Sequence, residues 1–122
     1  MGALDKYLAD DRALIEELKQ QHPIIQAHMA GAQNHQLAAA VCQAGGLGSV
    51  PAGMLDPAGL ETELSALEAL TDRPFGVNLI TMHPQLFDLI DVCARHEVGH
   101  VVLAGGLPPK GSIEAIKQKG AK

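Results

Sequence analysis

The sequence predicts an α/β protein, and three observations lead to this fold class. Short apolar segments alternate with amphipathic segments from residue 23 onward, which is the pattern of successive strand–helix units. Thirteen Gly and seven Pro supply many short turns, and 122 residues suffice for one domain with a buried core. Charged residues make up 19% of the chain, too few to indicate disorder.

The first expected element is an amphipathic helix over residues 3–20, which occupies a leading segment of residues 1–21. Its leucines recur at helical spacing, and charged residues fill most of the remaining positions. The apolar run 23–27 then predicts a buried strand. Asn34 is placed to cap a helix over residues 35–44 that ends at Gly45, and residues 47–50 predict a second strand.

The remaining elements repeat this alternation. Asp56 followed by Pro57 is typical of a helix start, and the helix that follows has leucines at intervals of three and four residues. We expect a third strand over residues 75–80 and a helix from Pro84 to about Arg95. A fourth strand over residues 100–104 and a last helix, capped by Ser112 and running to about Lys119, complete the series.

Four strand–helix units in a row imply parallel strands joined by right-handed crossovers. An open doubly wound sheet and a segment of a (β/α)8 barrel both fit this pattern. Both architectures place function at the carboxyl ends of the strands. We therefore expect a site formed by residues 27–31, 50–53, 78–83 and 104–108.

Charge and composition exclude several classes of function. Fourteen acidic and nine basic residues give a formal charge of −5, which disfavours binding to a nucleic-acid backbone. Aromatic residues are 2% of the chain, so it lacks the rings on which bases stack. No apolar run approaches the roughly 20 residues that span a bilayer. We expect a cytoplasmic protein with a small-molecule substrate and no membrane or nucleic-acid partner.

Residues 96–100 match the His-Glu-x-x-His pattern of zinc peptidases. This chemistry requires one continuous helix, so that His96 and His100 share a face and Glu97 lies beside a metal-bound water. The sequence of residues 98–102 instead favours a helix that ends near Arg95. The position six residues beyond His100, where the extended pattern needs a further histidine, is glycine. We therefore expect no metal site, and keep a zinc metallopeptidase as the alternative from a different class.

Four segments in order resemble the nitronate monooxygenase (2-nitropropane dioxygenase) family of FMN-dependent (β/α)8 barrels. They are residues 23–31, 37–41, 44–48 and 70–79, with the separations that the family shows. The resemblance extends from Pro23 to the end of the chain and weakens after Pro84. Flavin-dependent enoyl-ACP reductases share the same scaffold. The resemblance implies that residues 1–122 form the N-terminal half of one FMN-binding barrel domain, with about four βα units behind the leading helix.

The resemblance also implies a cofactor site. In the family, the loop after the first strand runs under the flavin ring, which corresponds here to Ala27, His28 and Met29. The asparagine that ends the third strand hydrogen-bonds the flavin, and its counterpart is Asn78. The family usually has proline at the position of His28. Its catalytic histidine and phosphate-binding glycines lie on later strands, so we assign no catalytic residue and expect the catalytic base beyond Lys122.

The function implied is FMN-dependent oxidation of alkyl nitronates with molecular oxygen. NAD(P)H-dependent reduction of an enoyl thioester is the alternative on the same scaffold, and a non-catalytic half-barrel used for assembly is a third. A half-barrel leaves two open sheet edges. The chain is therefore expected to be a fragment of a longer protein, or a unit that pairs with a second copy as a homo-oligomer; the fragment is favoured.

Overall fold

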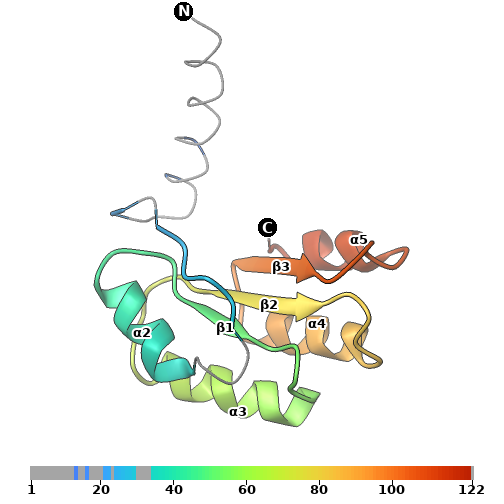
Figure 1. Ribbon diagram of the computed structural model, residues 1–122, viewed down its shortest axis with the longest axis horizontal. Helices are drawn as coiled ribbons and strands as arrows, with labels where there is room; N and C mark the ends of the chain where they lie inside the picture. The colour runs from blue at the N-terminus through green and yellow to red at the C-terminus, as the bar shows by residue number, and fades with distance from the viewer. Residues whose placement is uncertain (1–12, 14–15, 17–20, 23, 30–33, 122) are drawn as a thin grey trace, which may run out of the picture.

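The computed structural model describes residues 13, 16, 21–22, 24–29 and 34–121, and they form a parallel α/β structure (Figure 1). The elements follow in the order α2 (His35–Gln43), β1 (Ser49–Pro51), α3 (Pro57–Glu68), β2 (Gly76–Ile80), α4 (Leu86–Arg95), β3 (His100–Ala104) and α5 (Ser112–Gln118). The helix predicted over residues 3–20 lies outside the described residues except for Ala13 and Glu16, which are helical.

The strands lie side by side in the order in which they occur in the sequence. β2 lies between β1 and β3, and both pairings are parallel, with Val77 opposite Val50 on one side and Val101 on the other. On the outer side of β1, the amide of Leu47 donates to the Ile24 carbonyl at 2.9 Å. The segment at residues 24–26 and the strands β1, β2 and β3 therefore lie side by side in the order of the sequence.

The buried strand predicted over residues 23–27 is not found in the part of this segment that the structure describes. Ile25 forms a single parallel bridge with Leu47, and no regular ladder continues from it. Ile24 and Ile25 are 61% and 52% exposed, whereas Gln26 is buried. This segment has a described neighbour on one side only, and both isoleucines are exposed although consecutive side chains of an extended segment point to opposite faces.

Helices cover one face of the sheet. The side chains of Val50, Val77 and Leu79 are buried in one core with the leucines of α3 and α4. Helices that are consecutive in sequence pack against each other, α2 with α3, α3 with α4 and α4 with α5, so they form one layer. A doubly wound sheet has helices on both faces, and the described residues do not follow that arrangement. No described helix has the length and apolar character needed to cross a bilayer.

The predicted helix starts are confirmed at two of four positions. Asn34 Oδ1 accepts from the Leu37 amide at 3.0 Å, and Asp56 Oδ1 accepts from the Gly59 amide at 2.7 Å. Helix α4 starts at Leu86 rather than at Pro84, because the turn after β2 continues through residue 85. Ser112 is the first residue of α5 and not its cap: its hydroxyl donates to the Pro109 carbonyl at 2.7 Å.

Three helices end in the same hydrogen-bonded turn, in which the second residue after the last helical one adopts a left-handed conformation. That residue is Gly45 after α2 (φ +98°), Gly120 after α5 (φ +88°) and Glu97 after α4 (φ +52°). In the turn after α4, the Val98 amide donates to the Cys93 carbonyl at 3.0 Å. Glu97 therefore occupies a position at which the other two turns have glycine.

Candidate functional site

The face of the sheet opposite the helices carries a cavity near the carboxyl ends of the strands. Its volume is about 330 Å³, and its lining comes from the segment before α2, from β1 with the loop after it, and from β2: His28, Pro51, Gly53, Met54, Asn78 and Ile80. Carboxyl ends of strands are where α/β proteins bind ligands. This cavity therefore lies at the end of the sheet where the sequence predicted a site.

Asn78 lies in this cavity, in the middle of β2 and not at its end as predicted. Side chains alternate along a strand, so Asn78 faces away from Val77 and Leu79, which are buried under the helices. Its residual exposure is 6%. A buried amide of this kind offers one acceptor and two donor hydrogens to a bound molecule.

His28 lines the same cavity and contacts Ser49 of β1. Its Nε2 lies 2.7 Å from Ser49 Oγ, and the Ser49 amide donates to Gln26 Oε1 at 3.0 Å. Burial lowers the pKa of His28, because the charged imidazolium is less well solvated there. Ser49 thus contacts the first segment twice, through its amide to the Gln26 side chain and through its hydroxyl to the His28 ring.

The other two predicted site residues do not line this cavity. Ala27 is exposed, and Met29 is 55% exposed. Both lie in the extended segment that leads to residues 30–33, which are outside the described residues. The structure brings His28 and Asn78 together, and a role for Ala27 and Met29 stays a prediction.

Gln26 and Ser49 were not among the residues predicted from the sequence, and Thr81 was predicted only as part of the range 78–83. Gln26 Nε2 and Thr81 Oγ1 are buried and have no hydrogen-bond partner among the described residues. The two-residue spacing of Gln26 and His28 places them on one side of an extended segment, and this spacing was readable from the sequence. Ser49 has no such signal, since its contact with His28 depends on the register between two segments.

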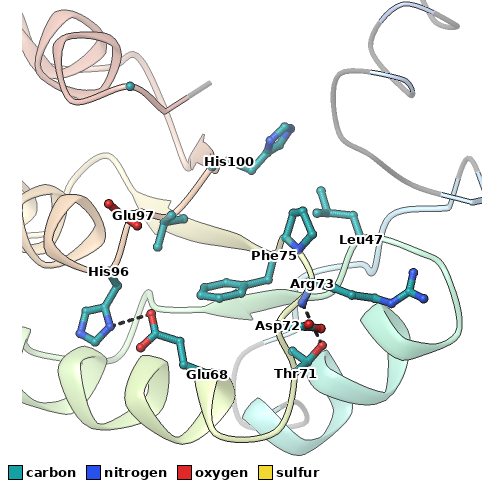
Figure 2. Close-up of a pocket in the computed structure, with 13 residues that line it drawn as sticks. Leu47, Glu68, Thr71, Asp72, Arg73, Phe75, His96, Glu97 and His100 are labelled. Atoms are coloured by element: carbon teal, nitrogen blue, oxygen red, sulfur yellow. Dashed lines mark hydrogen bonds and ion pairs between the residues drawn. The ribbon is translucent and has the colours of Figure 1, made fainter.

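A larger cavity, of about 510 Å³, lies at the opposite end of the sheet (Figure 2). Leu47, Phe75 and His100 mark it as the amino-terminal end of the strands, and its remaining walls come from the segments 68–74 and 96–99 and from Gly120. In parallel α/β folds this end serves stability rather than chemistry. Its size alone therefore does not make it the candidate site.

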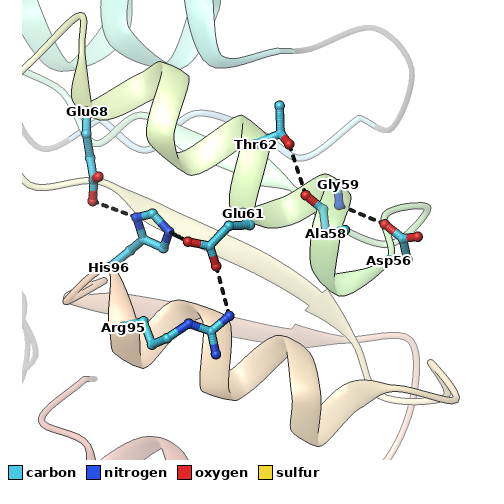
Figure 3. A network of polar contacts seen from close by, with 8 residues as sticks. All are labelled: Asp56, Ala58, Gly59, Glu61, Thr62, Glu68, Arg95 and His96. Atoms are coloured by element: carbon cyan, nitrogen blue, oxygen red, sulfur yellow. Dashed lines mark hydrogen bonds and ion pairs between the residues drawn. The ribbon is translucent and has the colours of Figure 1, made fainter.

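The His-Glu-x-x-His motif lines this second cavity without forming a zinc site (Figure 2), and His96 takes part in the polar network of Figure 3. Helix α4 ends at Arg95, as the sequence predicted, so His96 caps the helix while His100 begins β3. His96 Nε2 donates to Glu61 Oε1 at 2.7 Å and its Nδ1 donates to Glu68 Oε1 at 3.0 Å. Across residues 34–121 and the shorter described segments, no cluster of three potential ligands could hold a metal ion.

The two thiols are buried. Cys42 is a residue of α2 and Cys93 a residue of α4, and both side chains face the core. Burial raises the pKa of both, that of Cys93 to about 12, so the thiolate form is absent at neutral pH. Neither thiol has the properties of a nucleophile.

Comparison with known proteins gives one consistent family. A family model described as nitronate monooxygenase matches residues 11–107. The nitronate monooxygenase of Paraburkholderia phytofirmans is 46% identical over 77 residues, and a probable nitronate monooxygenase of Staphylococcus haemolyticus is 43% identical over 74 residues. These alignments cover 63% and 61% of this chain but 21% of each relative, so the chain spans about a fifth of their length.

Solved structures agree in fold. The structure of FabK from Thermotoga maritima has a TM-score of 0.84 and 39% identity, and the match covers 90% of this chain and 35% of that one. The nitroalkane oxidase from Streptomyces ansochromogenes has a TM-score of 0.78 and 31% identity, over 89% of this chain and 40% of that one. Both matches extend further than the sequence alignments do.

Proposed function

Because this chain belongs to the nitronate monooxygenase family, we propose that it is the flavin-binding part of an oxidoreductase that oxidises alkyl nitronates with molecular oxygen. The observation that carries the proposal is the family match over residues 11–107, which includes every residue lining the smaller cavity. A small-molecule substrate fits a cavity of this size. A cytoplasmic location and pairing with a second copy remain parts of the proposal.

We further propose that residues 1–122 are the N-terminal part of a single (β/α)8 barrel domain, with residues 1–21 as a leading helix. The sequential order of the strands and the single layer of helices support this architecture. The uncovered face, with Ser49, Asn78 and Val102, would line the barrel interior. β3, which has a described neighbour only in β2, would pair with the strand that follows.

The polar groups of the smaller cavity fit a flavin, and we propose that the cofactor is FMN. Asn78 is 6% exposed and lines the cavity, and a flavin ring has donors and acceptors along its polar edge. FMN, when bound, would carry electrons between the nitronate and oxygen. Asn78 would hold the ring edge, and the segment with Ala27, His28 and Met29 would support the ring from one side.

A second candidate is a flavin-dependent enoyl-ACP reductase. The similarity to FabK, with a TM-score of 0.84, favours it on structure, whereas the relatives found by sequence are named nitronate monooxygenases. The two activities differ in their co-substrate. Consumption of oxygen with an alkyl nitronate supports the first, and consumption of NADPH with an enoyl thioester supports the second.

The flavin site is tested by Asn78→Ala. We expect the complete protein that contains these residues to show flavin absorbance in the visible range, and its variant to bind FMN about tenfold more weakly, as one lost hydrogen bond implies. Asn34→Ala is the matched control, since Asn34 caps α2 and lies outside the cavity. Equal FMN content in the Asn78 variant and the control would contradict the assignment, and a colourless protein that FMN does not reconstitute would contradict the proposed function.

A further inference from the structure

The burial of Ser49 and its contact with His28 determine which of the two groups donates the hydrogen bond between them. Ser49 is 1% exposed, so its hydroxyl has no access to water. Among the residues described, the ring of His28 is its only hydrogen-bond partner, at 2.7 Å from Nε2. A buried hydroxyl that does not donate loses a hydrogen bond that it makes in water, at a cost of about 1–3 kcal/mol. The hydroxyl of Ser49 is therefore the donor and Nε2 of His28 the acceptor.

The tautomer of His28 follows from this assignment. A neutral imidazole that accepts at Nε2 carries its hydrogen on Nδ1. Protonation of the ring would place a second hydrogen on Nε2, directed at the Ser49 hydroxyl, and would force that hydroxyl to turn its own hydrogen elsewhere. Burial of the ring acts in the same direction, since it lowers the pKa of His28.

The backbone of Ser49 is held by contacts with the segment before α2 and with β2. Ser49 is the first residue of β1, and its amide donates to Gln26 Oε1 at 3.0 Å. Gly76 lies opposite Ser49 in β2, where a Cβ would come within 3.5 Å of the hydroxyl oxygen. The hydroxyl thus lies between two strands and has little freedom to follow a movement of the ring.

We propose that Ser49 positions His28 as a neutral hydrogen-bond donor, whose Nδ1–H binds an acceptor atom of the FMN held in the cavity that His28 shares with Asn78. The proposal rests on the proposed function for the identity of the ligand. Asn78 and His28 would then bind the same molecule from two neighbouring segments. His28 makes the contact, and Ser49 acts through it.

The test is a double-mutant cycle read by FMN affinity in the purified protein. His28→Phe keeps a planar ring and removes the donor, and we expect FMN binding to weaken about tenfold. Ser49→Ala leaves the ring free to change tautomer, and we expect a loss of about threefold to tenfold. In the double variant the serine substitution should have no further effect, because its role requires the histidine. Additive losses would overturn the positioning role of Ser49.

A spectroscopic measurement separates positioning from a general structural role. The ¹⁵N shifts of the His28 ring should report an unprotonated Nε2 and a protonated Nδ1 at neutral pH in the wild-type protein, and a mixture of tautomers in Ser49→Ala. His22→Phe is the control, since His22 is exposed and does not line the cavity. We expect its FMN affinity to equal that of the wild type.

The failures of the two proposals are distinguishable. If FMN binds and Asn78→Ala weakens it, but His28→Phe does not, the role of His28 is wrong and the flavin site stands. If the wild-type ring carries its hydrogen on Nε2, the inference is also wrong, whatever the variants do. If FMN does not bind to the wild-type protein at all, the proposed function fails first.

Discussion

The imidazole of His96 donates from Nε2 to the carboxylate of Glu61 at 2.7 Å, across the interface between α4 and α3. The other ring nitrogen donates to Glu68 at 3.0 Å, about two turns further along α3. Carboxylates only accept hydrogen bonds, so both nitrogens must carry hydrogen and the ring is an imidazolium. His96 therefore joins the two helices as a cation between two anions, and Arg95 adds a second cation on Glu61 at 2.8 Å.

The stabilisation by His96 should depend on pH. Burial by itself lowers the pKa of His96, but the hydrogen bonds to Glu61 and Glu68 outweigh it, and the pKa is raised above 6.5. The stabilisation is then fully present below about pH 6.5, the value of the unfolded state, and is lost as the pH rises through the folded-state pKa. We expect His96→Gln to cost about 1 kcal/mol in the free energy of unfolding at pH 6 and less at pH 9.

Urea unfolding of wild type and variant between pH 6 and pH 9 measures this difference. His83→Gln is the matched control, because His83 lies in a turn and makes no ion pair with a described residue. A cost of His96→Gln that is constant with pH would show that the ring is not charged in the folded state.

Replacing Glu97 by glycine should stabilise the protein. Glu97 has φ +52°, and a residue with a Cβ pays about 1 kcal/mol in this region, which glycine avoids. No described residue hydrogen-bonds the Glu97 side chain, so little is lost. We expect Glu97→Gly to raise the free energy of unfolding by about 0.5–1 kcal/mol in a thermal or urea titration.

Gly120→Ala provides the reverse experiment. Gly120 holds the same place after α5, with φ +88°, and a Cβ there meets no atom within 4 Å. The loss of stability in Gly120→Ala should therefore report only the cost of the left-handed backbone conformation, about 1 kcal/mol. If Glu97→Gly and Gly120→Ala shift stability in the same direction, the left-handed turn does not explain either effect.

Gly48→Ala should be strongly destabilising. A Cβ at Gly48 would lie 2.1 Å from the carbonyl oxygen of Ala38, which is backbone of α2 and cannot rotate away. Separating α2 from β1 to make room costs about 3 kcal/mol or more of packing. Gly99→Ala is the control, since a Cβ at Gly99 meets nothing within 4 Å; equal stability of the two variants would refute the close contact.

Removal of divalent metal should leave the protein unchanged. Both nitrogens of His96 are engaged by Glu61 and Glu68, and His100 lies on another element, so the motif at 96–100 has no shared face for a metal. Dialysis against a chelator should alter neither the melting temperature nor the FMN content. A drop of several degrees that zinc restores would show a metal site that this geometry excludes.

Local chemistry explains which elements the sequence predicted correctly. The caps at Asn34 and Asp56 and the end of α4 depend on residues close in sequence, and these predictions are confirmed. The strand at 23–27 was wrong because burial depends on neighbours that lie far along the chain. Ser112 was misassigned because its hydroxyl bonds back to Pro109 and not forward into the helix.

The residues of the candidate site also divide into those that the sequence predicted and those whose contacts depend on distant parts of the chain. His28 and Asn78 were predicted from the family resemblance and lie in ranges expected at the strand ends, and they share a cavity. Ser49 was missed because its contact with His28 exists only through the register that pairs Ile25 with Leu47. The roles of Ala27, His28, Met29 and Asn78 toward FMN stay predictions.

The sequential strand order has a consequence for how the chain acquires its structure during synthesis. Each strand pairs with the one that left the ribosome immediately before it, and each helix packs on the previous helix. No described strand must wait for a partner more than one strand–helix unit away, because Ser49 pairs with Gly76 and Gly76 pairs with His100. Structure can therefore grow vectorially, one unit at a time, behind the advancing nascent end.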